Sequence, residues 1–421
     1  MGIKLRLIVM NFLQYAIWGS YLTSMGTLLV GIDMADKIGF FYAMQGIVSL
    51  FMPAVIGIIA DRWIPAQKLL GACHMLAAGF LAAAAYYISS AATDVNFAVL
   101  FSLYAVSMAF YMPTIALSNS VAYSVLESNN LDTVKAFPPI RVWGTVGFIC
   151  AMLFCDFAGF QQSYMQFYQS AVLGIALAIY AFTLPNCPTS KGGETRSLVE
   201  ALGLRAFALF KEKKMAIFFI FSMLLGVSLQ ITNGFANPFI SSFSLIPEFA
   251  ETFAAQHANA LISLSQVSET LCILLIPFCL KRFGIKKVML MSMVAWVLRF
   301  GLFGVGNPGG GVWMFILSMI VYGVAFDFFN VSGSLFVNKE TDPSIRASAQ
   351  GLFMIMTNGI GATIGTLGAQ QVVNHFVYSQ SDPVAQTAGW STTWLVFAGY
   401  ALVVTILFAL IFKYKHNPEE A

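Results

Sequence analysis

Nine stretches of 23 or more residues in this 421-residue chain contain no Asp, Glu, Lys or Arg. They are residues 7–32, 38–60, 69–93, 95–126, 157–190, 215–247, 300–326, 347–381 and 383–412. A helix needs about 20 mostly apolar residues to cross the 30 Å hydrocarbon core of a bilayer. Each stretch therefore predicts a membrane span. With 58% apolar and 10% charged residues, the chain lacks the polar groups that cover a water-soluble protein, which excludes a soluble enzyme or a nucleic-acid binder.

Three further spans are predicted to contain ionisable residues. The uncharged segment 142–155 has only 14 residues, so a span there must take in Arg141, Asp156 or both. A span at about 257–280 contains Glu269, and one at about 288–306 contains Arg299. The tenth span, at about 311–336, runs on through Asp327. We therefore predict an all-α membrane protein with 12 transmembrane helices.

The distribution of lysine and arginine predicts the orientation of the chain. Of the 22 Lys and Arg residues, Arg141 and Arg299 lie within spans. If both termini are cytoplasmic, Lys37 alone lies in an outer loop, and the remaining 19 lie in inner segments. Inner loops carry such an excess of positive charge. We expect a multi-pass protein of the cytoplasmic (inner) membrane with both termini in the cytoplasm.

The longest polar interruption, residues 185–214, divides the chain into two sets of six spans. We expect an N-terminal half over residues 1–184, a cytoplasmic central loop over 185–214, and a C-terminal half over 215–421. The basic turns GIIADRW (57–63) and KRFGIKK (281–287) occupy corresponding places in the two halves. This organisation resembles that of the major facilitator superfamily, whose halves are related by parallel repeats.

Four ionisable residues are predicted to lie within the hydrocarbon: Arg141, Glu269, Arg299 and Asp327. Each costs about 2.5–3.5 kcal/mol on insertion scales if it is unpaired. Two acids and two bases suggest internal pairing in or near a hydrated cavity. Arg141 lies near the inner end of its span and has the alternative of reaching the interface. Arg299 is either a structural partner or part of a gate.

Polar and aromatic residues accompany these charges at helical spacing. The candidates are Arg141, Thr145, Phe148, Gln230, Asn233, Gln266, Glu269, Tyr322, Phe326 and Asp327. Gln14, Trp18 and Tyr21 also share one face of the first span. A single aromatic residue is more often lipid-facing or packed in the core, and a membrane-embedded amide often makes an interhelical hydrogen bond. Their convergence on spans five, seven, eight and ten favours a binding site.

The chemistry of these side chains favours one class of ligand. Amides and carboxylates suit hydroxyls and ring nitrogens, and aromatic faces suit a planar ring. A sugar that carries an aromatic base offers both. A phosphorylated ligand fits poorly, because only two basic groups lie within the membrane and both have acidic groups to satisfy.

Several strings resemble those of the bacterial nucleoside:proton symporters of the major facilitator superfamily. They are FLQYAIWGSYL (12–22), FPPIRVWGT (137–145), MAIFFIFSMLLG (215–226), LQITN (229–233), SQVSET (265–270), SMIVYGVAFDFFN (318–330) and RASAQG (346–351). The resemblance implies the major facilitator fold, alternating access, and uptake of purine and pyrimidine nucleosides with protons by a monomer in the lipid bilayer. It implies that the ten candidate residues line a central cavity, that Glu269 and Asp327 couple protons, and that neither a cofactor nor a metal is needed.

Other functions remain open on the residues alone. One is a major facilitator antiporter or permease for another small neutral polar or aromatic solute, of which a drug:proton antiporter is one case. An intramembrane enzyme is disfavoured, because the six cysteines are scattered and no HExxH motif occurs. A sensor that does not transport would have no need of two matched halves.

The two acids are expected to have different roles. Glu269 lies three residues from Gln266 on the same helix face, which favours it as both substrate acceptor and proton carrier. Asp327 is turned about 100° from Phe326, which favours a charge partnership with Arg141 or Arg299. We therefore expect Glu269 to carry the proton, with the reverse assignment as the alternative.

Overall fold

The computed structural model describes residues 2–91, 94–189, 204–343 and 345–415, and within these ranges the regular structure is helical throughout. The chain divides into two compact units. The N-terminal unit comprises Met1–Met34 and Ile47–Leu202, and the C-terminal unit comprises Ala35–Gly46 and Gly203–Ala421. Nearly half of the predicted central loop, residues 190–203, lies outside the described residues, so the boundary at 185–214 stays a prediction.

Eight helical segments are each long and apolar enough to cross a membrane. They are Ala66–Ala91, Phe97–Ser128, Lys135–Phe157, Lys213–Leu245, Ile285–Val305, Val312–Glu340, Ser348–Tyr378 and Pro383–Ile411. Two bent helix pairs, Ala35–Ser49 with Met52–Arg62 and Ala258–Ile273 with Ile276–Phe283, bring the number to ten. The other two predicted spans are 17-residue helices, α1 (Ile3–Gly19) and α8 (Met165–Ala181). The prediction of 12 spans in two halves agrees with this architecture.

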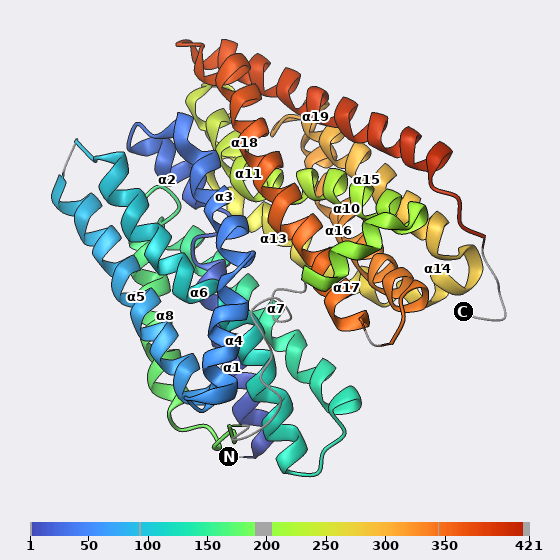
Figure 1. The fold of residues 1–421 in the computed structure, drawn as a ribbon. Helices are drawn as coiled ribbons and strands as arrows, with labels where there is room; N and C mark the ends of the chain where they lie inside the picture. The colour runs from blue at the N-terminus through green and yellow to red at the C-terminus, as the bar shows by residue number, and fades with distance from the viewer. Residues whose placement is uncertain (1, 92–93, 190–203, 344, 416–421) are drawn as a thin grey trace. The chain divides into compact units, whose positions relative to one another are not determined.

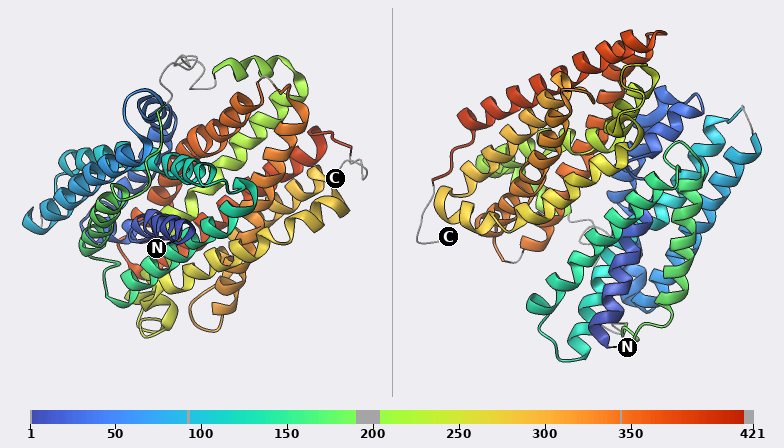
Figure 2. Two further views of the ribbon diagram at one scale, coloured as in Figure 1. Left: turned by 90° about the horizontal axis from the view of Figure 1, so that it is seen from below. Right: turned by 180° about the vertical axis from the view of Figure 1, so that it is seen from behind.

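The N-terminal unit is built around α1. Its other helices are α2 (Met25–Gly31), α4 (Met52–Arg62), α5 (Ala66–Ala91), α6 (Phe97–Ser128), α7 (Thr133–Phe157) and α8. Helices α5 and α8 run side by side in both figures (Figures 1 and 2). Helix α7 extends through both Arg141 and Asp156, which confirms that the short uncharged segment 142–155 takes in its charged neighbours.

The C-terminal unit contains more helices, several of them short. They are α10 (Lys213–Leu229), α11 (Ile231–Ser242), α12 (Phe253–Gln256), α13 (Ala258–Ile273), α14 (Ile276–Phe283), α15 (Ile285–Val305), α16 (Val312–Glu340), α17 (Arg346–Met354), α18 (Ala362–Val373) and α19 (Pro383–Ile411). Helices α15 and α16 pack together, and α15 also packs against α19. Between α17 and α18 the chain forms a π-helix over Ile355–Gly361.

The start of α3 (Ile38–Ser49) groups with the C-terminal unit through one buried amide. The Gln370 side chain on α18 accepts a hydrogen bond from the Gly39 N–H (2.5 Å) and donates one to the Ala35 carbonyl (3.0 Å). A Cβ at position 39 would lie 2.8 Å from the Gln370 Cβ. Gly39 thus permits the close approach of α3 to α18.

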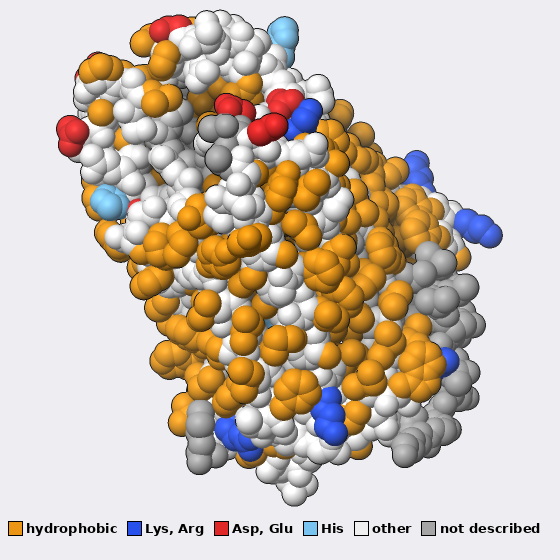
Figure 3. Space-filling model, turned by 90° about the vertical axis from the view of Figure 1, so that its left-hand side faces the viewer, with side chains coloured by type: hydrophobic (Ala, Val, Ile, Leu, Met, Phe, Trp, Pro, Cys, Tyr) orange, Lys and Arg blue, Asp and Glu red, His pale blue; other side chains and the backbone are white. Residues whose placement is uncertain are grey.

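Exposed apolar side chains cover much of the molecular surface. On the face shown in Figure 3, hydrophobic side chains occupy the middle and charged ones lie mainly at the margins. Tyr86 on α5, Val172 on α8 and Leu410 on α19 are each more than 60% exposed. Such a surface would be unfavourable in water and suits contact with lipid chains.

Candidate functional site

The N-terminal candidates Arg141, Thr145 and Phe148 lie on α7 where it crosses α1. Side chains at Gly147 or Gly19 would collide with backbone at Phe12 or Phe148, so these glycines allow the two helices to touch. The half-buried Arg141 guanidinium lies over the Tyr15 ring, 3.8 Å from its centroid. The close crossing of α1 and α7 thus places a cation against an aromatic face.

Phe148 is buried one turn beyond Thr145, with an exposed fraction of 7%. Its ring meets the edge of Trp18 at a centroid distance of 6.4 Å and an interplanar angle of 88°. The buried indole N–H of Trp18 has no hydrogen-bond partner among the described residues. Half-exposed Thr145 and Arg141 leave polar groups on the same helix that a ligand can reach.

Gln14, flagged by its helical spacing with Trp18 and Tyr21, has a structural role. It is fully buried, donates to the Thr114 hydroxyl (2.8 Å), and pairs through its amide oxygen with His74 Nε2 (2.7 Å). The Tyr111 hydroxyl donates to the Gln14 carbonyl (2.8 Å). This network ties α1 to α5 and α6, so the interhelical-bond interpretation holds for Gln14.

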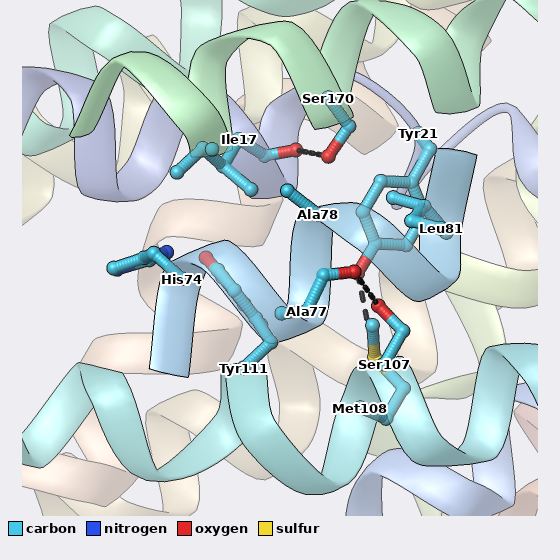
Figure 4. Close-up of a pocket in the computed structure, with 11 residues that line it drawn as sticks. Ile17, Tyr21, His74, Ala77, Ala78, Leu81, Ser107, Met108, Tyr111 and Ser170 are labelled. Atoms are coloured by element: carbon cyan, nitrogen blue, oxygen red, sulfur yellow. Dashed lines mark hydrogen bonds between the residues drawn. The ribbon is translucent and has the colours of Figure 1, made fainter. Parts of the chain in front are cut away.

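A small pocket lies beside this network in the interior of the N-terminal unit (Figure 4). Its hydroxyls point toward the protein: Ser107 donates to the Ala77 carbonyl and Ser170 to the Ile17 carbonyl, both at 2.8 Å. None of the ten predicted binding residues is among its lining residues. We therefore assign this pocket to packing between helices.

In the C-terminal unit, Gln230 lies at the break between α10 and α11. Helix α10 ends at Leu229 and α11 begins at Ile231. The Asn233 side-chain N–H donates to the Gln230 amide oxygen (2.7 Å). This bond leaves the Gln230 amino group as a donor and the Asn233 oxygen as an acceptor, side by side.

Tyr322, Phe326 and Asp327 lie on α16, next to Gln266 and Glu269 on α13. Tyr322 and Phe326 stack with their centroids 5.7 Å apart and their planes at 19°, which confirms that they share a face. The Gln266 side chain lies beside the Tyr322 hydroxyl, and the Glu269 carboxyl interacts electrostatically with Asp327 and Tyr322. The structure thus brings all five side chains into one cluster.

Asp327 was expected to pair with Arg141 or Arg299, and within the C-terminal unit it does not pair with Arg299. The Arg299 guanidinium donates instead to the Ser318 carbonyl (2.8 Å) and the Ser265 hydroxyl (3.3 Å). Asp327 is only 7% exposed, and its Oδ2 has no hydrogen-bond partner among the described residues. The reason is the rotation of α15, which directs Arg299 toward Ser318 and the Tyr322 ring rather than toward the next turn of α16.

The C-terminal cluster offers a stacked aromatic pair, one amide and two carboxyl groups. Aromatic faces pack against planar rings, while the amide and the acids can exchange hydrogen bonds with ring nitrogens and hydroxyls. In the described ranges, no group of three or more His, Cys, Asp and Glu residues is placed to hold a metal ion. The arrangement suits binding of a polar ligand with an aromatic ring.

Two aromatic neighbours of these candidates were not predicted from the sequence. Tyr15 lies under Arg141, and Trp296 meets the edge of Tyr322 at a centroid distance of 6.0 Å. Tyr15 falls next to the Gln14, Trp18 and Tyr21 face rather than on it. Helical spacing relates residues on one helix only, so it gave no signal for either contact.

Known proteins match this chain over nearly its whole length. A family model described as "Nucleoside H+ symporter" matches residues 1–417. The chain is 49% identical to the xanthosine permease of Escherichia coli (strain K12), over all of this chain and 98% of that protein. It is 48% identical to the nucleoside permease NupG of the same organism, over 99% of this chain and 97% of that protein.

Solved structures show the same fold. The crystal structure of the nucleoside transporter NupG superposes with a TM-score of 0.90 at 47% identity, covering 99% of this chain and all of that one. A D-xylose–proton symporter superposes with a TM-score of 0.70 at 12% identity, over 99% of both chains. The second match, at such low identity, concerns the fold alone.

Proposed function

Because this chain belongs to the nucleoside H+ symporter family, we propose that it carries purine and pyrimidine nucleosides into the cell together with protons. The single observation that supports this choice of substrate most strongly is the cluster of Tyr322, Phe326, Gln266 and Glu269. A stacked ring pair beside an amide and an acid matches a nucleobase attached to a ribose.

We infer that the ten candidate residues contact the nucleoside. In the C-terminal unit, Tyr322 and Phe326 take the face of the base, and the Gln230–Asn233 pair offers it one donor and one acceptor. Gln266 and Glu269 accept hydrogen bonds from ribose hydroxyls. In the N-terminal unit, Arg141 and Thr145 supply donors and Phe148 an aromatic surface.

Protons supply the driving force for alternating access in this proposal. A membrane potential of 100 mV contributes about 2.3 kcal/mol per charge, and one pH unit contributes about 1.4 kcal/mol. Together these support roughly 500-fold accumulation of a neutral nucleoside for each proton. Glu269 and Asp327 are the buried or half-buried acids that can take part.

We further propose a monomer in the inner membrane with both termini in the cytoplasm. The imbalance of Lys and Arg between predicted inner and outer segments supports the orientation. The relatives are permeases, so we propose transport without catalysis and without a cofactor.

Uptake of labelled uridine by a bacterium that lacks its own nucleoside transporters tests this function. Cells expressing the protein are expected to accumulate uridine, and a protonophore is expected to abolish accumulation. Unlabelled uridine should compete, and uridine 5′-phosphate should not, because Arg299 is already bonded to Ser265 and Ser318 and the carboxyl groups of Glu269 and Asp327 disfavour a phosphate in the proposed site. Accumulation that survives the protonophore, or equal competition by the nucleotide, would contradict the proposal.

The amide pair gives a more local test. Gln230→Ala and Asn233→Ala are each expected to weaken uridine binding by about 1–3 kcal/mol, because each removal leaves a hydrogen-bonding group of the ligand or of the remaining amide unpaired. Isothermal titration of the purified protein measures this loss, and its expression level is the control. Undiminished affinity with poor expression would favour a purely interhelical role.

A further inference from the structure

Arg299 is a buried cation on α15 whose bonds do not go to a carboxylate. It is 2% exposed, and its Nη1 donates to the Ser318 carbonyl (2.8 Å) and the Ser265 hydroxyl (3.3 Å). The Ser318 hydroxyl donates back to the Arg299 carbonyl (3.0 Å). These bonds fix the guanidinium between α13, α15 and α16, so its position is well defined.

The fixed guanidinium lies over the ring of Tyr322. The distance from its carbon to the ring centroid is 4.4 Å, within the range of a cation–π interaction. Trp296, one turn before Arg299, meets the same ring edge-on at 89°. Two residues of α15 thus constrain Tyr322, which in turn stacks on Phe326.

Packing alone gives no reason for an arginine at this position. A buried charge without a carboxylate carries a desolvation cost, and buried ionic groups are often replaced by apolar side chains of similar volume without loss of stability. The Arg299 Nε also has no hydrogen-bond partner among the described residues. A methionine or leucine would fill the same space at lower cost.

We infer that Arg299 is a positioning residue: it holds the Tyr322 ring, and through it the Tyr322–Phe326 pair, in the orientation that receives the nucleobase. This inference rests on the proposed function, which assigns Tyr322 to the nucleoside site. Arg299 is too buried to reach the ligand and acts through the aromatic ring.

A double-mutant cycle on the purified full-length protein tests the inference. Uridine affinity by isothermal titration and thermal stability are measured for wild type, Arg299→Met, Tyr322→Leu and the double variant. Arg299→Met is expected to lose about tenfold in affinity with a melting temperature at or above that of wild type. In the Tyr322→Leu background, the same change is expected to have no further effect, because the ring on which Arg299 acts is absent.

Arg282→Met is the matched control. Arg282 also lies over an aromatic ring, with its guanidinium carbon 5.8 Å from the Phe283 centroid, but it is exposed at the end of α14. This variant should bind uridine as wild type does. Arg299→Lys, which keeps the cation and loses the planar group, should lose less affinity than Arg299→Met. If Arg299→Met does not fold, the cycle is run with Arg299→Lys.

Three results separate the possible failures. Unchanged affinity with a lowered melting temperature would show a purely structural Arg299 and overturn the inference. Additive losses in the double variant would also overturn it, because Arg299 would then act independently of Tyr322. Full affinity in Tyr322→Leu alone would instead contradict the assignment of Tyr322 to the site, and with it the premise taken from the proposed function.

Discussion

Asp327→Asn is expected to abolish accumulation of uridine above its external concentration, while exchange of uridine across the membrane continues. Asp327 is 93% buried on α16, and its Oδ2 has no hydrogen-bond partner among the described residues. A buried carboxylate without a donor is costly, and a second carboxyl, Glu269, lies close enough to interact with it. For these reasons we assign the coupling proton to Asp327.

An asparagine has nearly the same shape as a protonated aspartic acid but cannot release a proton. The variant should therefore cycle with substrate bound and fail only in steps that need the charged form. Proteoliposomes separate the two activities, with an imposed pH gradient for accumulation and preloaded uridine for counterflow. Asp94→Asn, the same change at an exposed residue near the start of α6, should behave as wild type. Full accumulation in Asp327→Asn would contradict the assignment.

This prediction revises the one made from the sequence. The sequence favoured Glu269 as the proton carrier, because Asp327 was expected to pair with an arginine. Within the C-terminal unit, Arg299 bonds to Ser318 and Ser265 instead. Without that bond to an arginine, Asp327 has the environment of a group that holds a proton.

The spans could be predicted from the sequence because a charged residue is costly anywhere in the hydrocarbon, so long stretches without charge mark the spans. Helix α7 runs through Arg141 and Asp156 as expected, and α16 runs through Asp327. The 54° bend between α13 and α14 was not predicted. It falls at Leu274 and Leu275, just before Pro277 in the first turn of α14, and a proline there favours the start of a new helix.

Within the candidate site, relations along one helix were predictable and relations between helices were not. The 3.6-residue period placed Tyr322 over Phe326, and Gln230 next to Asn233. The partners of Gln14 and Arg299 depend on how neighbouring helices are rotated about their axes. That rotation is set by side-chain packing across the whole unit, which no local spacing encodes.

Glu269→Gln is expected to weaken uridine binding by roughly 10- to 100-fold and to leave proton-driven accumulation in place at saturating uridine. Glu269 is half-buried on α13 and is therefore more accessible to ligand than Asp327. It lies one turn from Gln266, whose side chain is beside the Tyr322 hydroxyl. A hydrogen bond to a charged acceptor contributes about 1.5–3 kcal/mol, and the neutral amide loses the charge-assisted part of that bond.

The two acid variants thus form a test with opposite signatures. Isothermal titration should show the large loss of uridine affinity for Glu269→Gln. The proteoliposome assay should show the loss of proton-driven accumulation for Asp327→Asn. If Glu269 were the proton carrier, Glu269→Gln would keep counterflow and lose accumulation even at saturating uridine, and Asp327→Asn would still accumulate. The two roles require different burial. An acid that accepts hydrogen bonds from the substrate must be accessible to it. An acid that keeps its proton while the substrate-loaded protein changes conformation is best shielded from water and from fixed cations.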